Sequence, residues 1–336
     1  MSKYVYLFII LFFIINTIFN LCMSKYIYIF VALVLVFGFI INTVRHWGDW
    51  KIDEYKKQNG LLSNETEIKI ALGKFQLSKY YDSIAPLIRW GIDLRLTETE
   101  ENRLFIGSSK FGGRPDLPSD VEWPKSGNGT PMEFVAQINL EEARLADVEE
   151  QMPSHGIVYL FFSFTYAVED YRDPQCFKVI YVEKPEGLSR RDFPEDVERK
   201  QPSKKIDFIE YLSLPTFDWS DLKKMGMTEA EQDAYYELCG THFQIVMLGH
   251  ILTVQGPMEY DCEDQRLQRN MGNLLPESWE ERSALFTQLD SWIPFFYLNN
   301  DWLDPNGDGS DIAFYIQKQD LKNGDFNKMC LVIQAD

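Results

Sequence analysis

The stretch "FGGRPDLPSDVEWPKSGNGTPMEFVAQINLEEA", residues 111–143, decides the fold that we expect of this chain. Its first half is rich in glycine and proline, which exclude a regular helix and favour turns and extended segments. Phe134–Ile138 has the apolar character of a strand. Asn139 is suited to begin a helix, because its side chain can accept a hydrogen bond from a free amide group of the first turn. The stretch therefore predicts loops, then one strand, then a helix over residues 140–152.

Apolar runs farther along the chain predict more strands. "GIVYLFFSF" at residues 156–164 is too short to cross a membrane and fits a buried strand. Residues 176–182, 311–317 and 328–334 also have strand-like patterns. Turn-forming residues, more often than crossover helices, separate these runs. The expected fold class is therefore α+β with mostly antiparallel sheets.

A faint internal repeat indicates two related halves. Phe134–Asn139 matches Leu285–Asp290 in pattern, and each segment follows a glycine-rich loop and precedes a strand rich in tyrosine and phenylalanine. We therefore expect one large domain over residues 75–336, built from pseudo-symmetric halves at about 75–210 and 211–336.

The N-terminus contains a much clearer duplication. "MSKYVYLFIILFFIINT" begins at Met1 and "MSKYIYIFVALVLVFGFIINT" begins at Met23. The apolar parts are residues 4–22 and 26–44, and the second would form roughly 28 Å of helix, close to the thickness of a bilayer core. The sequence predicts one or two N-terminal transmembrane helices within an anchor over residues 1–50, followed by a linker over residues 51–74.

Two arrangements of this anchor remain open. Both copies can form a helical hairpin, or translation can begin at Met23 and leave a single span, which the repeated start sequence favours. Arg45, Lys51, Lys56 and Lys57 follow the second apolar run, whereas Lys25 alone immediately precedes it. Because positive residues collect on the cytoplasmic side, we expect a cell-membrane protein whose large domain faces the cytoplasm.

The charge and the cysteines exclude several classes of function. A formal net charge of −18 at pH 7 repels phosphate backbones, so no nucleic-acid partner is expected. Cys176, Cys239, Cys262 and Cys330 lack CxxC spacing, which argues against a zinc site. No HExxH motif, P-loop or dinucleotide fingerprint is present, and we expect no cofactor.

Several motifs resemble the YwqG-like proteins, a bacterial family classed as a domain of unknown function. The similarity covers roughly residues 75–336 and implies the family's fold, with departures at His250 and around Asn306. The matching segments are Gly113–Pro118, Glu122–Pro124, Phe134–Leu140, Gly156–Phe162, Ser213–Pro215, Gln255–Met258, Cys262–Glu263, Leu285–Ser291, Asp320–Phe326 and Val332–Gln334. The resemblance supplies no catalytic residue, and members of the family mostly look soluble and cytoplasmic.

"DPNGDGSD" at residues 304–311 is the sharpest local motif. Asp304, Asn306 and Asp308 occupy ligand positions of a calcium loop, but Tyr315 replaces the glutamate that such a loop requires. We therefore expect a structural turn and treat these three residues as a weak metal candidate only.

Gln137 and Gln288 occupy matching positions in the repeat, which places both in strands. They could line a ligand pocket between the halves, or they could form a satisfied buried hydrogen-bonded pair, which we favour. Glu259, Asp261 and Glu263 alternate as on one face of a strand and could hold a metal or form an acid/base pair, but a solvated face explains them more simply. Arg114 and Gln255 lie within the family-like motifs, and Trp123 is either a rim aromatic or a loop anchor.

Two hypotheses of function follow. The first is a binding or interaction module that recognises a protein or peptide partner. The second is a hydrolase-like enzyme with a pocket between the halves, using Glu259, Asp290, Asp308 or His250. The candidate binding residues are Arg114, Trp123, Gln137, Gln255, Glu259, Gln288, Asp290 and Asp308.

Overall fold

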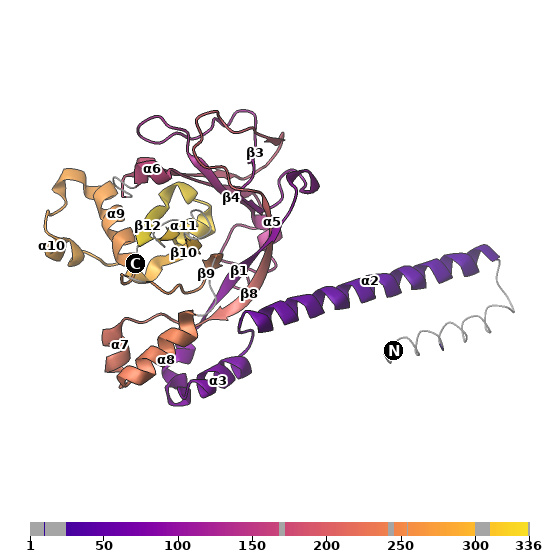
Figure 1. The fold of residues 1–336 in the computed structure, drawn as a ribbon, viewed down its shortest axis with the longest axis horizontal. Helices are drawn as coiled ribbons and strands as arrows, with labels where there is room; N and C mark the ends of the chain where they lie inside the picture. The colour runs from indigo at the N-terminus through magenta and orange to yellow at the C-terminus, as the bar shows by residue number, and fades with distance from the viewer. Residues whose placement is uncertain are drawn as a thin grey trace. The chain divides into compact units, whose positions relative to one another are not determined.

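The structure, a computed structural model, describes Ile10 and residues 25–167, 172–240, 245–253, 255–299 and 310–334. The chain divides into two compact units, Met1–Asn59 and Gly60–Asp336. The first unit contains helix α2, which runs from Lys25 to Gln58 (Figure 1).

The helices that the structure describes contradict the prediction of transmembrane helices at the N-terminus. Among the residues that the structure describes, no helix is both long enough and apolar enough to cross a membrane. Helix α2 does not stop after the apolar run but continues through the charged segment 51–58. The first apolar copy, residues 4–22, lies outside the described residues except for Ile10.

The second unit is built around one ten-stranded sheet in which every described pairing is antiparallel. Its order is β12-β11-β10-β9-β1-β8-β2-β4-β5-β6, and β3 pairs with β7 in a separate two-stranded sheet. The strands are β1 Arg89–Glu98, β2 Lys110–Phe111, β3 Asp116–Leu117, β4 Glu133–Asn139, β5 Ile157–Phe162, β6 Phe177–Val182, β7 Ser189–Arg190, β8 Lys204–Ser213, β9 Ile245–Leu248, β10 Trp292–Asn299, β11 Asp311–Gln317 and β12 Cys330–Gln334.

Helices connect and flank these strands. The α-helices of this unit are α3 Glu65–Lys74, α4 Tyr81–Ile84, α5 Leu140–Ala143, α6 Phe164–Ala167, α7 Trp219–Lys224, α8 Glu229–Gly240, α9 Glu259–Met271, α10 Trp279–Ser283 and α11 Lys318–Asn323. The 3-10 helices are η1 Ser78–Tyr80, η2 Ala85–Leu87, η3 Glu101–Arg103, η4 Pro174–Cys176, η5 Gly272–Leu274, η6 Leu289–Ser291 and η8 Phe326–Lys328. Helix α5 is therefore much shorter than the predicted helix over residues 140–152.

The two longest strands hold the sheet together at its centre. β1 and β8 pair over their whole lengths, from Arg89 opposite Ser213 to Glu98 opposite Lys204. On the other side β1 pairs with β9, and β8 pairs with β2. Four strands extend from each of these contacts, β9 to β12 on one side and β2, β4, β5 and β6 on the other.

The expectation of several main sheets was also wrong, because a single ten-stranded sheet passes through both predicted halves. The matched segment Leu285–Asp290 is not a strand: Gln288 precedes the 3-10 helix η6. The strand is instead the next segment, Trp292–Asn299, which is buried at all but its last position. This run is more apolar than Leu285–Asp290, so it occupies the place in the core.

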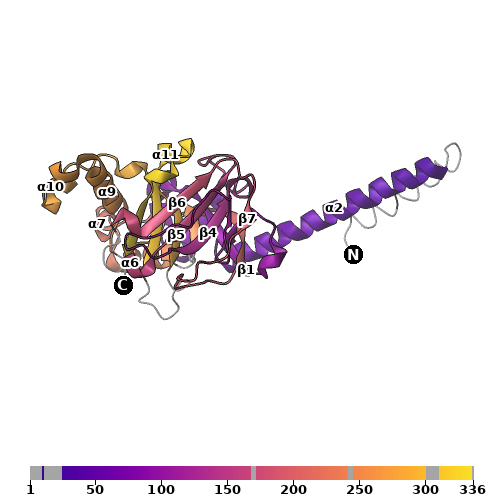
Figure 2. The same ribbon diagram turned by 90° about the horizontal axis from the view of Figure 1, so that it is seen from above.

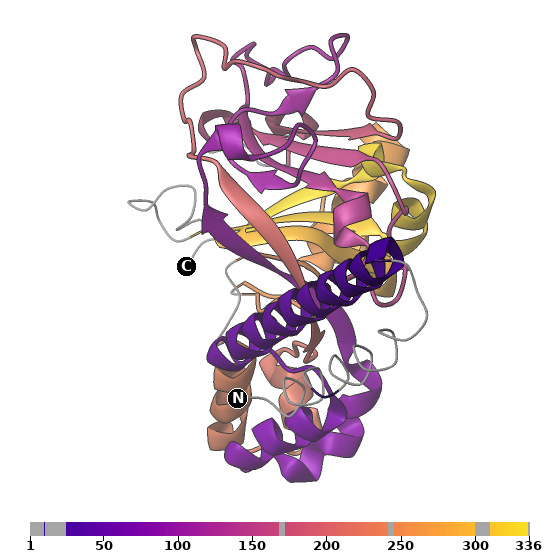
Figure 3. The same ribbon diagram turned by 90° about the vertical axis from the view of Figure 1, so that its right-hand side faces the viewer.

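The sheet curls until its two edges nearly meet (Figures 2 and 3). Phe177 on β6 packs edge-on against Phe314 on β11 with ring centroids 6.0 Å apart. Tyr181 on β6 packs against Phe326 of η8 at 4.8 Å. One hydrophobic core cluster accordingly includes residues from both sets of four strands. The antiparallel pairing agrees with the sequence-based expectation, but it belongs to one nearly closed sheet.

A smaller helical lobe lies at one end of the sheet, where α3, α7 and α8 gather (Figure 1). It has its own core, to which Leu72, Ile84, Leu222 and Tyr235 contribute. Helix α8 begins with a capping box in which Thr228 N donates to Glu231 Oε2 over 2.9 Å. The lobe positions the segment that follows β8 against the sheet, where it lines a pocket.

Candidate functional site

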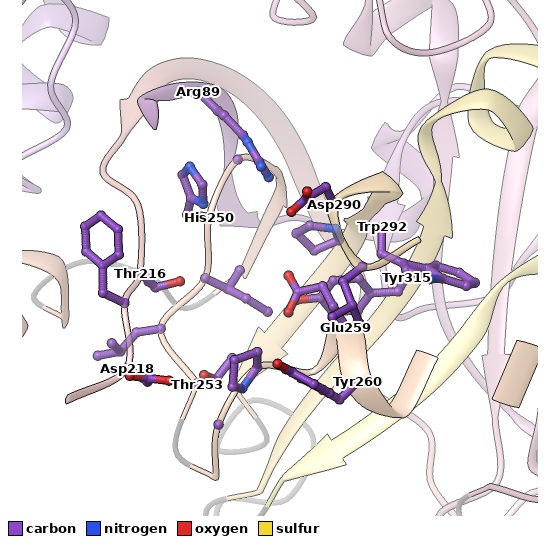
Figure 4. Close-up of a pocket in the computed structure, with 18 of the residues that line it drawn as sticks. Arg89, Thr216, Asp218, His250, Thr253, Glu259, Tyr260, Asp290, Trp292 and Tyr315 are labelled. Atoms are coloured by element: carbon purple, nitrogen blue, oxygen red, sulfur yellow. The ribbon is translucent and has the colours of Figure 1, made fainter. Parts of the chain in front are cut away.

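A pocket of about 380 Å³ lies where the sheet, helix α9 and the helical lobe meet (Figure 4). Its lining residues come from several separate segments of the chain. Arg89 is the first residue of β1, Glu259 is the first residue of α9, and Asp290 belongs to η6. The remaining lining residues include Thr216, Phe217, Asp218, Trp219, Tyr236, His250, Thr253, Tyr260, Trp292, Pro294 and Tyr315.

The turn after β9 brings His250 to the pocket. Gly249 has φ +70°, and an added Cβ would lie 3.0 Å from the Cα of Gly91 and from the Cβ of Ser213. Only glycine fits a left-handed conformation with such close neighbours. Ser213 Oγ then accepts a hydrogen bond from His250 N over 2.8 Å and donates to His250 O over 3.2 Å. The backbone of His250 is therefore held against β8.

The His250 side chain is neutral at physiological pH. Its Nε2 lies 2.8 Å from the carbonyl oxygen of Leu87, and because a carbonyl only accepts, Nε2 carries the proton. Burial and, to a lesser extent, the nearby Arg89 guanidinium lower the pKa of His250 to about 4, although the hydrogen bond to Leu87 acts in the opposite direction. In this tautomer Nδ1 keeps its lone pair, so it is a hydrogen-bond acceptor.

Four charged side chains line the pocket in the described part of the chain. Asp218 caps helix α7 by accepting a hydrogen bond from Asp221 N over 2.9 Å, and the other three are Arg89, Glu259 and Asp290. Arg89 and Glu259 are half-buried, and Asp290 is exposed at the rim. Burial raises the pKa of Glu259, Asp290 raises it further, and Arg89 opposes both effects. Within the described part of the chain, none of these three side chains makes a hydrogen bond or ion pair with another residue. Their charges are therefore left for solvent or a ligand to satisfy.

A buried carboxylate holds the segment that carries Asp290. Glu263 of α9 accepts two 2.8 Å hydrogen bonds from Arg266, one of 3.1 Å from Trp292 Nε1, and others from the amides of Thr287 and Gln288. Burial alone would raise the pKa of Glu263, but these donors, led by Arg266, lower it to about 2. This network fixes η6 and the indole of Trp292 at the pocket wall.

Tyr315 of β11 is buried and lines the pocket beside Glu259 and Trp292 (Figure 4). Burial raises its pKa well above the ordinary value, and the neighbouring Glu259 raises it further. The hydroxyl therefore stays protonated and can donate a hydrogen bond.

The structure brings together three of the residues that the sequence singled out separately: Glu259, Asp290 and His250 line this one pocket. Asp308, with Asp304 and Asn306 of the weak metal candidate, lies outside the described residues. Among the residues that are described, no group of three or more histidine, cysteine, aspartate or glutamate side chains is arranged to hold a metal ion.

Gln137 and Gln288 belong to different networks. Gln137 on β4 is fully buried, and its amide group donates to Ser108 O over 2.7 Å and to Asp116 Oδ2 over 3.0 Å. Gln288 is exposed, is not in a strand, and accepts a 2.5 Å hydrogen bond from Gln317 Nε2. The prediction that both glutamines lie in strands was therefore wrong for Gln288.

Three other candidate residues lie elsewhere. Arg114 pairs with Glu101 over 2.7 Å and with Asp192 over 2.6 Å. Trp123 donates from Nε1 to Met132 O over 2.9 Å and packs on Phe161, as a loop anchor does. Gln255 N donates to Gln334 Oε1 over 3.1 Å.

The predicted strand through Glu259, Asp261 and Glu263 is instead the first turn of helix α9. In a helix, residues four apart such as Glu259 and Glu263 lie on the same face one turn apart, whereas Asp261 points to another side. Glu259 reaches the pocket, Asp261 pairs with Arg172 over 3.2 Å, and Glu263 is buried in the network described above. The prediction of one solvated face was therefore wrong.

The motif at Gly113–Pro118 forms a buried clamp. Asp116 is fully buried, accepts from Arg190 Nε over 2.8 Å, and lies 3.2 Å from the equally buried Lys110 Nζ. Burial lowers the pKa of Lys110, whereas Arg190 and Lys110 overcome the opposite effect of burial and lower the pKa of Asp116. We assign this network a structural role, since it joins β2, β3 and β7.

Arg89, Trp292 and Tyr315 were missed as site residues. All three lie in strands, and nothing in the local sequence distinguishes Trp292 and Tyr315 from residues of the core. The signal available for Arg89 was a charge at the start of an alternating apolar segment, "RWGIDLRL".

Comparison with known proteins adds a family but no activity. No curated protein matches this chain. The family model described as "Domain of unknown function (DUF1963)" matches residues 109–335, which include the clamp and, apart from Arg89, the charged residues of the pocket. Because this match covers well over half of the sequence, the chain belongs to the DUF1963 family of domains of unknown function.

Proposed function

We propose that this chain is a binding module whose pocket holds a small ligand with both an anionic and a cationic group. The observation that carries the proposal is the convergence of Arg89, Glu259 and Asp290 on one pocket without hydrogen-bonded or ionic partners among the described residues. Partly buried charges are costly unless they are paired. A ligand that pairs both signs therefore gains more than one that pairs a single sign.

Each ligand group has a partner of suitable chemistry. The planar guanidinium of Arg89 can donate two parallel hydrogen bonds to a carboxylate. Glu259 and Asp290 are acceptors for an ammonium group, and Tyr315 and the Nδ1 atom of His250 offer further polar contacts. The volume of about 380 Å³ lies at the lower end of the range for small-molecule pockets, which suits a molecule of dipeptide size.

This proposal specifies the peptide-binding hypothesis. A short peptide has an ammonium group at one end and a carboxylate at the other, and we propose that the chain is a YwqG-like member that recognises such a ligand. A hydrogen-bonded pair among the acid and base groups would favour the hydrolase-like alternative. Among the described residues, no hydrogen bond joins any two of Glu259, Asp290 and His250. Binding is therefore the better-supported function.

The test uses glycylglycine and two relatives that each lack one charge, titrated into the full chain and followed by calorimetry. N-Acetylglycylglycine lacks the ammonium group, and glycylglycinamide lacks the carboxylate. We expect glycylglycine to bind at least about tenfold more tightly than either, which corresponds to one missing charged hydrogen bond.

Variants assign the binding to the pocket. Arg89→Gln is expected to weaken glycylglycine binding about tenfold or more. Arg103→Gln is the matched control, because the Arg103 side chain is 72% exposed and pairs with Glu100 at the surface. Equal affinity for all three compounds, or an Arg89→Gln variant that binds like the wild type, would contradict the proposal.

A further inference from the structure

A second cavity of about 210 Å³ adjoins the pocket. The two share Thr216, His250 and Leu252 in their walls, so the same side chains face both spaces. The second cavity lies between helix α3, the end of β8 and helix α8 of the helical lobe.

The chemistry of this cavity is apolar. Its lining includes Leu61, Phe75, Leu214 and Leu238. Cys239 also lines it, and burial raises the pKa of this thiol to about 12, so the thiol is neutral. Among the described lining residues, the one ammonium group belongs to Lys74, which is exposed to solvent. A cavity of this kind takes up a hydrocarbon group by the hydrophobic effect.

The order of groups across the pocket fixes which end of a ligand lies beside this cavity. Arg89 acts electrostatically on His250, Glu259 and Lys318, whereas the effects of Asp290 appear on Glu259 and Lys318. Figure 4 shows the same order, with Arg89 between His250 on one side and Asp290 and Glu259 on the other. A carboxylate on Arg89 therefore lies nearer the wall shared with the second cavity than an ammonium group on Asp290 does.

We propose that the ligand carries an apolar side group next to its carboxylate, and that this side group enters the second cavity past His250. The inference rests on the proposed function and names its ligand class: a short peptide whose C-terminal residue has an apolar side chain. The neutral His250 imidazole suits this arrangement, because a charged imidazole would lose hydration when a hydrocarbon group packs beside it, which is costly.

Two isomeric dipeptides test the inference. Glycyl-leucine and leucyl-glycine have the same composition, charge and hydrophobicity, and differ only in which group carries the side chain. We expect glycyl-leucine to bind the full chain at least about tenfold more tightly than both leucyl-glycine and glycylglycine, as burial of a leucine side chain allows.

A variant that fills the cavity provides the second test. Ala71→Leu adds carbon atoms to the cavity wall on helix α3 and should remove the advantage of glycyl-leucine while leaving glycylglycine affinity unchanged. Ile70→Leu, at an exposed position on the same helix, is the control. Thermal unfolding shows whether each variant is folded, and the dipeptide comparison on the wild type stands even if Ala71→Leu is not.

The outcomes separate the two proposals. If glycylglycine binds with the expected dependence on both charges but the two leucine isomers bind equally, or leucyl-glycine binds more tightly, the apolar inference is overturned and the binding module stands. If none of the dipeptides binds, or Arg89→Gln has no effect, the proposed function itself fails. A tenfold preference for glycyl-leucine that Ala71→Leu abolishes supports both.

Discussion

Replacing Glu263 with glutamine should destabilise the second unit by an amount that can be worked from the structure. Glu263 is fully buried and accepts hydrogen bonds from Arg266, Trp292, Thr287 and Gln288. Its pKa is lowered from the ordinary 4.5 to about 2, and a tenfold change in proton affinity corresponds to about 1.4 kcal/mol. The charged form therefore contributes about 3 kcal/mol to the free energy of unfolding at neutral pH. Glutamine keeps the shape but loses the charge, so the loss should be about 2–3 kcal/mol.

The sign of the pH dependence follows from the direction in which the pKa moves. The folded-state pKa lies below the unfolded value, so the stabilisation is fully present above about pH 5 and is lost as the pH falls toward 2. The difference in unfolding free energy between the wild type and Glu263→Gln should therefore shrink over that interval. Urea unfolding at a series of pH values measures it.

Glu280→Gln is the matched control, because Glu280 is an exposed glutamate in the adjoining helix α10. It should change the unfolding free energy by less than about 0.5 kcal/mol. A loss below about 1 kcal/mol for Glu263→Gln, or a loss of constant size from pH 7 to pH 3, would refute the conclusion that the charged Glu263 carboxylate stabilises the fold. Because the hydrogen bonds of Glu263 hold η6, the same variant should also weaken binding at Asp290.

Three further predictions concern stability. Asp116→Asn should lower the free energy of unfolding, measured with urea, by about 3 kcal/mol, because it leaves the buried Lys110 and the Arg190 guanidinium without their carboxylate. Asp192→Asn, at a side chain that is 86% exposed, should leave that free energy almost unchanged. Gly249→Ala should lower the melting temperature far more than Gly187→Ala, because both have positive φ but only the alanine at 249 meets neighbours at 3.0 Å. His250→Gln should flatten the pH dependence of stability, because the pKa of His250 is lowered from 6.5 to about 4 in the folded state. In the wild type the contribution of the neutral imidazole is fully present above about pH 6.5, and it is lost as the pH falls toward 4 because the unfolded chain takes up the proton first. A wild-type profile unchanged between pH 6.5 and 4 relative to the variant would contradict the last of these.

The strands that local apolar patterns predict are those with few polar residues. The predicted runs at residues 156–164, 176–182 and 311–317 correspond closely to β5, β6 and β11. β8 is not among the predicted strands, because polar residues occupy much of its length. Its charges are paired across the sheet, as Arg95 and Asp207 show at 2.9 Å. The alternation of apolar and polar residues along β8 was the available signal.

The pocket could be anticipated only in part, and the reason is its construction. Glu259, Asp290 and His250 are chemically conspicuous types, so each could be proposed on its own from the sequence. Arg89 and Tyr315 lie near opposite ends of the domain sequence and meet because β9 pairs with β1 while β9 also pairs with β10, which pairs with β11. No short motif contains this information, since the lining residues come from separate segments between Arg89 and Tyr315. The charge pairing proposed for the ligand is therefore a property of the closed sheet: separating β9 from β1 would remove Arg89 from the carboxylates, even though every pocket residue remained in the sequence.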